Sequence, residues 1–203
     1  MAASTVAPPI ILRSVEKHTS TLIFFHGLGD QGDGWASVFK EEMRVPYIKY
    51  IFPNAQSRPV TLNFGMRMPA WYDILGLTAN SADEQGIEIA KDYVHGLINK
   101  EIEDGISSKR ISIGGFSMGA ALALYLTPTA GLTFDKPLGC IISLSGYLIQ
   151  RSKLPGDEQG IEIAKDYVHG LINKEIEDGI SPKRISIGGF SMGAALALYL
   201  SLF

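Results

Sequence analysis

Residues 115–119 read Gly-Phe-Ser-Met-Gly, a serine between two glycines in the pattern G-x-S-x-G. They follow residues 110–114 (RISIG), a run typical of a strand, and precede residues 120–126 (AALALYL), a run typical of a buried helix. A turn this tight requires glycine on both sides and pushes the serine hydroxyl outward. We therefore predict that Ser117 is a nucleophile and that the N–H of Met118 faces a developing oxyanion. The alternative is a glycine-rich turn that holds an ordinary serine.

A second loop, residues 26–30 (HGLGD), follows the apolar run at residues 21–25 (TLIFF). A loop of the H-G-x-G kind at the end of a strand can present a backbone N–H to an oxyanion, so we predict that the N–H groups of Leu28 and Met118 act as a pair. His26 has two interpretations. It either holds the shape of this loop, which we favour, or is the base that accepts the serine proton.

Strands and helices alternate along the chain. Strands are expected at residues 21–25, 47–52, 110–114 and 139–144, and helices at residues 83–104 and 120–126. Such alternation predicts an α/β fold with a mostly parallel sheet and helices on both faces. In such sheets the chemistry belongs at the carboxyl ends of the strands, so the loops after Phe25, Gly114 and Leu144 are the expected site.

Composition excludes several other classes of protein. The 203 residues fit one domain, and a net charge of −3 with interspersed charges does not suit nucleic-acid binding. No apolar run approaches membrane-spanning length, so stable membrane insertion is not expected. The only cysteine, Cys140, lies in the apolar residues 138–144, where we expect it to be buried. A single cysteine forms no internal disulfide, so a reducing, cytoplasmic location is expected.

The chain repeats itself over 44 residues. Residues 83–126 recur as residues 157–200 with one difference, Ser108 in the first copy and Pro182 in the second. Two nearly identical copies do not fit a solenoid, whose repeats diverge and number three or more. The repeat indicates either a recent duplication or an error of transcript or genome assembly, and both remain open.

Several blocks together resemble the acyl-protein thioesterase and lysophospholipase-like carboxylesterase family of α/β-hydrolases: FFHGLGDQGDGW, IFPNAQSRPVTLN, MPAWYDI and ISIGGFSMGAALALY. The similarity runs over residues 21–148. It implies hydrolysis of the thioester between palmitate and protein cysteines, with S-palmitoylated proteins or lysophospholipids as substrates and no metal or cofactor. It also implies that Trp71 and Leu77 line an acyl channel, although both are equally explained as core residues. Members of the family can associate weakly, so a weak homodimer is possible.

The resemblance fails after residue 148. The family continues to a strand that ends in His-Gly-Asp, whose aspartate is catalytic, and later to a catalytic histidine, but here the second copy follows and places Ser191 in a duplicate elbow. A serine has no charge with which to replace the aspartate. The histidines other than His26 are expected at the surface or its margin, and they are His18, His95 and His169. We therefore expect a single, C-terminally incomplete domain over residues 1–203, with a nucleophile but no triad.

Three hypotheses follow from this sequence. The first is a serine hydrolase whose turnover is reduced by ~10⁴ to 10⁶ because triad members are missing. The second is a non-catalytic module that binds acyl chains. The third is a misassembled or truncated product of an ordinary thioesterase gene. The second copy could add a strand to the sheet or compete with the first copy for one position, and competition would favour misfolding or swapping.

Overall fold

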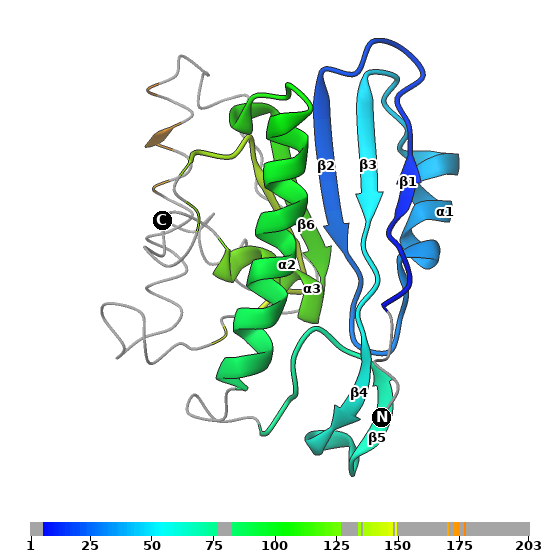
Figure 1. Ribbon diagram of the computed structural model, residues 1–203, viewed down its shortest axis with the longest axis vertical. Helices are drawn as coiled ribbons and strands as arrows, with labels where there is room; N and C mark the ends of the chain where they lie inside the picture. The colour runs from blue at the N-terminus through cyan, green and yellow to red at the C-terminus, as the bar shows by residue number, and fades with distance from the viewer. Residues whose placement is uncertain are drawn as a thin grey trace, which may run out of the picture.

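A computed structural model describes residues 6–76, 83–126, 134, 136–147, 149, 170, 173–174 and 177. Five strands form the main sheet in the order β1-β3-β2-β6-β7 (Figure 1). Strand β1 pairs antiparallel with β3, and the other pairs are parallel. The strands of this sheet are β1 (Ile10–Leu12), β2 (Ser20–Phe25), β3 (Ile48–Phe52), β6 (Ile111–Phe116) and β7 (Ile141–Leu144).

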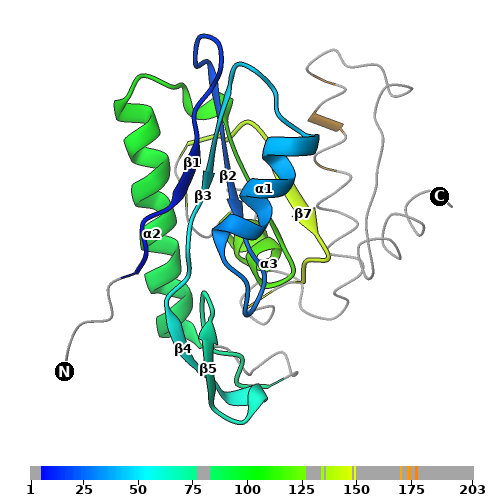
Figure 2. The same ribbon diagram turned by 90° about the vertical axis from the view of Figure 1, so that its right-hand side faces the viewer.

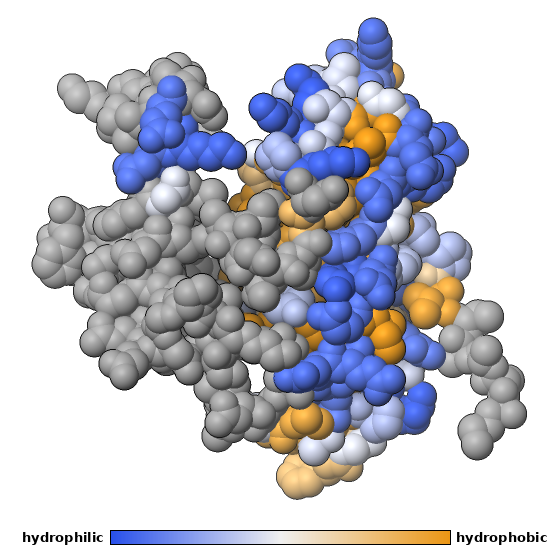
Figure 3. Space-filling model, turned by 60° about the vertical axis from the view of Figure 1, so that its left-hand side comes forward, coloured by the Kyte–Doolittle hydropathy of each residue, from blue (hydrophilic) through white to orange (hydrophobic). Residues whose placement is uncertain are grey.

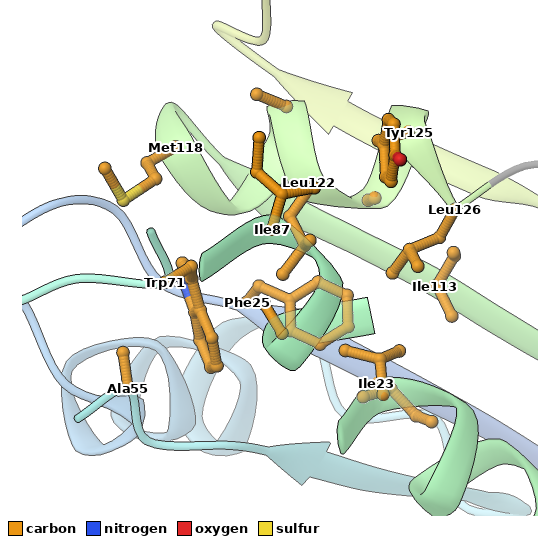
Figure 4. Packing of buried hydrophobic residues seen from close by; sticks show 14 of the residues in the cluster. Ile23, Phe25, Ala55, Trp71, Ile87, Ile113, Met118, Leu122, Tyr125 and Leu126 are labelled. Atoms are coloured by element: carbon orange, nitrogen blue, oxygen red, sulfur yellow. The ribbon is translucent and has the colours of Figure 1, made fainter. Parts of the chain in front are cut away.

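Helices cover both faces of this sheet (Figure 2). Helix α1 (Gly32–Glu42) lies on one face, and α2 (Glu84–Glu103) and α3 (Met118–Tyr125) lie on the other. Alternate residues of β2 divide between the two sides: Phe24 packs with α1, whereas Ile23 and Phe25 pack beneath α2 and α3. Figure 4 shows this second side, where Phe25 meets Ile87 of α2 and Leu122 of α3. The sheet is thus a buried layer whose apolar strands need cover on both faces.

The helix limits agree with the sequence pattern. Asp83 caps α2 by accepting a hydrogen bond from the N–H of Gly86, and Gly105, at φ +94°, follows the last turn. Helix α3 begins at Met118, two residues before the predicted start, because Ser117 itself is its N-cap. Exposed polar residues of α2 form the blue stripe down the middle of Figure 3.

A second, two-stranded sheet lies at the carboxyl end of the parallel strands. Strands β4 (Ser57–Val60) and β5 (Met66–Pro69) form a hairpin around the short 3₁₀ helix η1 (Thr61–Asn63) (Figure 1). Its tip exposes Leu62, Phe64 and Met66. Phe64 is 95% exposed and has φ +53°, a left-handed conformation that is unfavourable for a bulky residue.

One expectation about the core is wrong. Cys140 is exposed rather than buried. Its carbonyl accepts a hydrogen bond from the N–H of Ile113, so its backbone joins the sheet while its side chain does not enter the core. The physical reason is that β7 is the outermost strand of the described sheet, and its residues are only half-buried.

Candidate active site

Ser117 occupies a strained turn between β6 and α3. Its backbone has φ +52° and ψ −116°, far from the regions that a residue with a Cβ normally occupies. Two hydrogen bonds hold it there: its N–H donates to the carbonyl of Leu144 over 2.8 Å, and its carbonyl accepts from the N–H of Ala121 over 2.9 Å. Such strain costs on the order of 1 to 3 kcal/mol and is typical of functional sites.

The two flanking glycines are required by contact with other backbone atoms. A Cβ atom at Gly115 would lie 2.5 Å from the carbonyl carbon of Gly119. A Cβ atom at Gly119 would lie 2.5 Å from the carbonyl oxygen of His26 and would also strike that of Phe25. The G-x-S-x-G spacing therefore lets α3 pack directly on the end of β2.

The H-G-x-G loop lies beside the serine. A Cβ atom at Gly27 would be 3.5 Å from the Cβ of Ser117. Met118 is the first residue of α3, so its N–H has no acceptor within the helix. The N–H groups of Gly29 and Asp30 donate to the carbonyls of Pro69 and Gly27, which fixes the loop around Leu28. The structure brings the predicted nucleophile and the loop of the predicted oxyanion pair together, while the role of that pair stays a prediction.

His26 holds the loop through both ring nitrogens. Nδ1 donates to the carbonyl of Gly27 at 2.7 Å, and Nε2 accepts from the N–H of Ala55 at 3.0 Å. The side chain is fully buried, and this burial lowers the pKa of the imidazole below 6.5, although the Gly27 hydrogen bond acts in the opposite direction. With both nitrogens committed and the pKa lowered, His26 is poorly suited to accept the proton of Ser117.

Trp71 packs against the loop at residues 26–30 from the side of the core. Its Nε1 donates to the carbonyl of His26 at 2.9 Å, and its ring meets those of His26 and Phe25 at centroid distances of 4.9 and 5.5 Å. The side chain is buried in the core (Figure 4). The proposed channel role of Trp71 stays a prediction, and Leu77 lies outside the described residues.

The sequence does not predict a contact between two tyrosines, Tyr72 and Tyr147. The hydroxyl groups of Tyr72 and Tyr147 share a hydrogen bond of 2.7 Å, which joins the segment after β5 to the segment after β7. Burial raises the pKa of both phenols, that of Tyr72 well above 10. Tyr72 lies in a block quoted for the resemblance, but nothing in the sequence marks it as the partner of a residue 75 positions away.

The other described histidines lie on different parts of the fold. His18 precedes β2, at the opposite end from Ser117, and its ring hydrogen-bonds to Thr21, so it is less exposed than the sequence suggests. His95 lies on α2, where its ring meets that of Phe134 at 5.1 Å. Ser191 and His169 fall outside the described residues. Among the residues that are described, no cluster of three histidine, cysteine or acidic side chains could hold a metal ion.

A parallel sheet with a strained G-x-S-x-G turn beside an H-G-x-G loop defines the class of α/β-hydrolases. Within that class the chain belongs to the Phospholipase/Carboxylesterase family, whose model matches residues 7–162 and, in a second match, residues 152–203. The overlapping matches agree with the internal repeat.

Individual relatives agree with this assignment. The chain is 44% identical over 158 residues to acyl-protein thioesterase 1 of Neurospora crassa, covering 73% of this chain and 63% of that protein. It is 43% identical over 178 residues to acyl-protein thioesterase 1 of Schizosaccharomyces pombe, covering 87% and 76%. The crystal structure of Zea mays acyl-protein thioesterase 2 superposes with a TM-score of 0.62 at 32% identity, covering 77% of this chain and 71% of that one. The chain therefore spans less than two thirds of the Neurospora relative. None of the helices that the structure describes is long and apolar enough to cross a membrane.

Proposed function

We propose that this chain is an acyl-protein thioesterase-type serine hydrolase in which Ser117 is the nucleophile and whose turnover is strongly impaired. The observation that carries the proposal is the strained backbone of Ser117 beside Gly27. The strained turn brings α3 against the end of β2 while Ser117 itself stays half-buried, and this is the geometry expected where a hydroxyl must be presented to a substrate.

The chemistry would be acyl transfer to Ser117 followed by hydrolysis. The hydroxyl oxygen attacks the thioester carbonyl and gives its proton to solvent, the N–H groups of Leu28 and Met118 stabilise the resulting oxyanion, and the thiolate leaves. Water then hydrolyses the acyl-serine ester, which releases the fatty acid and restores the hydroxyl. S-acylated proteins are the proposed substrates because the relatives are named acyl-protein thioesterases. Lysophospholipids are a second proposed substrate class because the matching family is described as Phospholipase/Carboxylesterase.

We expect impaired turnover because a base for Ser117 is lacking among the described histidines near the strands. His26 is committed to the loop, and His18 lies at the other end of β2, so neither is placed to accept the serine proton. With none of the described histidines placed to take its proton, Ser117 stays protonated at neutral pH, and the loss of triad members costs about 10⁴ to 10⁶ in turnover.

A fluorophosphonate probe and an S-acyl peptide test this proposal. We expect slow labelling at Ser117 that is lost in Ser117→Ala, and slow thioester hydrolysis that added imidazole accelerates in the parent chain but not in Ser117→Ala. Labelling as fast as in an intact serine hydrolase would show that a base is present. Labelling that is unchanged by Ser117→Ala would remove Ser117 from the mechanism.

Acyl binding without turnover is the second candidate function, and the committed ring of His26 favours it. A fluorescent palmitoyl peptide distinguishes the two. Binding at micromolar concentration with no imidazole-dependent hydrolysis would support a binding module, whereas imidazole rescue supports the hydrolase.

A further inference from the structure

The contacts that seat α2, β6 and α3 on the rest of the fold use side chains that occur twice in the chain. Residues 83–126 and residues 157–200 differ only at Ser108 and Pro182. At every position except 108, the second copy therefore has the same residue as the first. It can make each contact with residues 6–76 that the first copy makes through those positions. Three of these contacts each require a particular residue.

The first contact is a buried ion pair at the amino end of the sheet. Glu101, 1% exposed, accepts a hydrogen bond from Lys49 Nζ at 2.5 Å and another from Thr21 Oγ1 at 2.7 Å. A buried carboxylate is tolerated only when it is paired in this way. The residue equivalent to Glu101 in the second copy is Glu175, which offers the same carboxylate.

The second contact lies at the start of α2. Asp83 caps the helix, accepts a hydrogen bond from the N–H of Asp73 at 2.8 Å, and forms an ion pair with Arg58 at 3.6 Å. Its equivalent is Asp157. A helix that begins at Asp157 could use the same arginine and the same N–H group.

The third contact is steric. Gly119 approaches the carbonyls of Phe25 and His26 so closely that only glycine fits. Its equivalent is Gly193, so the second copy meets this demand as well.

Pro182, the one residue that differs between the copies, also suits the position of Ser108. Ser108 opens the 3₁₀ helix η2 (Ser108–Arg110), and the preceding Ser107 has φ −58° and ψ 139°. Proline is favoured at the first position of a helix, and the residue before a proline is favoured in this extended conformation. Pro182 can therefore take the place of Ser108.

The segments that precede the two copies touch through their side chains. Tyr72 precedes the first copy and Tyr147 precedes the second, and their hydroxyl groups are 2.7 Å apart. Asp83 follows Tyr72 by eleven residues, and Asp157 follows Tyr147 by ten. While β7 is in place, the second copy is therefore held close to the entry of the first copy by a linker of nearly the same length, which favours their encounter before β7 is released.

We propose that residues 157–200 are an alternative occupant, within the same chain, of the position that residues 83–126 fill.

The two states are not equivalent, because β7 lies between the copies in sequence and pairs with β6. Suppose that β7 stayed in place while the second copy entered. The chain would then run from β7 back to the position of β6, and the connecting helix would lie on the face of the sheet that α2 covers. That connection would be left-handed, which is strongly disfavoured. Entry of the second copy therefore releases β7, and this cost makes the first copy the default occupant.

Blocking one copy at a time tests the exchange in the full chain. Gly119→Val places a side chain against the carbonyls of Phe25 and His26 and bars the first copy. Gly193→Val is the matched control that bars the second copy, and a double variant bars both. We expect each single variant to retain cooperative unfolding by circular dichroism, and Gly119→Val to be the less stable because it loses β7. The double variant should lose cooperative unfolding. If Gly119→Val is as unfolded as the double variant, the proposal is wrong.

A disulfide identifies the occupant directly. Leu22 is the register partner of Ser112, whose equivalent in the second copy is Ser186. In a Cys140→Ser background, Leu22→Cys with Ser186→Cys should form an intrachain disulfide in the Gly119→Val variant and not in the Gly193→Val variant. Leu22→Cys with Ser112→Cys should show the reverse. Absence of the Ser186→Cys disulfide in the Gly119→Val variant, or its formation only between two chains, would overturn the proposal.

Discussion

The backbone N–H of Ala55 donates a hydrogen bond to Nε2 of His26 across 3.0 Å, between the loop after β3 and the loop after β2. Removal of the imidazole leaves this buried N–H without its acceptor, which costs about 1 to 3 kcal/mol, and also removes one of the two hydrogen bonds that the Gly27 carbonyl accepts. We expect His26→Ala to lower the free energy of unfolding by about 2 to 4 kcal/mol. Urea unfolding measures it, with His18→Ala as the control at a less buried histidine. A change below 0.5 kcal/mol would contradict this role.

The lowered pKa of His26 predicts a pH dependence. The folded protein binds a proton at this ring less readily than the unfolded chain, whose histidine titrates near 6.5. Below pH 6.5 the unfolded state takes up the proton first, so stability falls as the pH falls from 6.5 toward the lower folded pKa, and it is constant above that window. Urea unfolding between pH 5 and 8 should show this slope in the parent chain and a smaller slope in His26→Gln. Equal slopes would show that other groups cause the pH dependence.

Lys49 should be needed to pair the buried carboxylate of Glu101. Lys49→Met leaves a carboxylate buried without its cation, and we expect a loss of about 3 kcal/mol. Lys49→Arg keeps the charge and should lose less than half as much. Both values follow from thermal or urea unfolding at pH 7, and a Lys49→Arg variant as unstable as Lys49→Met would show that packing rather than charge is important there.

Phe64 should be replaceable with a gain in stability. It is almost fully exposed and left-handed, so its side chain contributes little packing while its Cβ is strained. Asparagine tolerates φ near +53°, and Phe64→Asn should raise the free energy of unfolding by about 0.5 to 1 kcal/mol. Phe64→Ala, which keeps a Cβ without this tolerance, is the control. Equal stability of the two variants would contradict the argument from strain.

Ser108→Pro should be neutral or stabilising. The position is the start of η2, and proline there restricts the unfolded chain at no cost to the fold, a gain of about 0.4 to 1 kcal/mol. Calorimetry of the full chain measures the shift in Tm. A loss greater than 1 kcal/mol would show that proline does not fit, and it would also weaken the proposed exchange of the two copies.

The sequence predicted the parts of the fold that rest on local pattern. The apolar runs of β2 and β6 and the amphipathic residues of α2 carry strong periodic signals, so the sequence predicts these elements and a mostly parallel sheet, but not the order of the strands within it. The turn at Ser117 was predictable because only glycine fits beside it. Strand β1 was missed because it has only three residues at an antiparallel edge. The β4–β5 hairpin was missed because Pro59 argues against a strand.

Contacts between distant segments could not be predicted in this way. Nothing in the local pattern of residues 138–144 distinguishes an outer strand from a central one, so Cys140 was assigned to the core. The same holds for the pairing of Tyr72 with Tyr147 and of Glu101 with Lys49, since each depends on which segments the sheet order brings together. The commitment of both His26 nitrogens likewise needed the position of Ala55, which lies 29 residues further along the chain.

The close approach of Gly119 to the carbonyls of Phe25 and His26 has a mechanical consequence. Main-chain atoms, rather than flexible side chains, set the spacing between the helix that carries Ser117 and the strand that leads to Leu28. The Ser117 hydroxyl and the N–H groups of Leu28 and Met118, the predicted oxyanion pair, are therefore expected to move together as one rigid unit, so that motion of the surrounding surface preserves their mutual alignment.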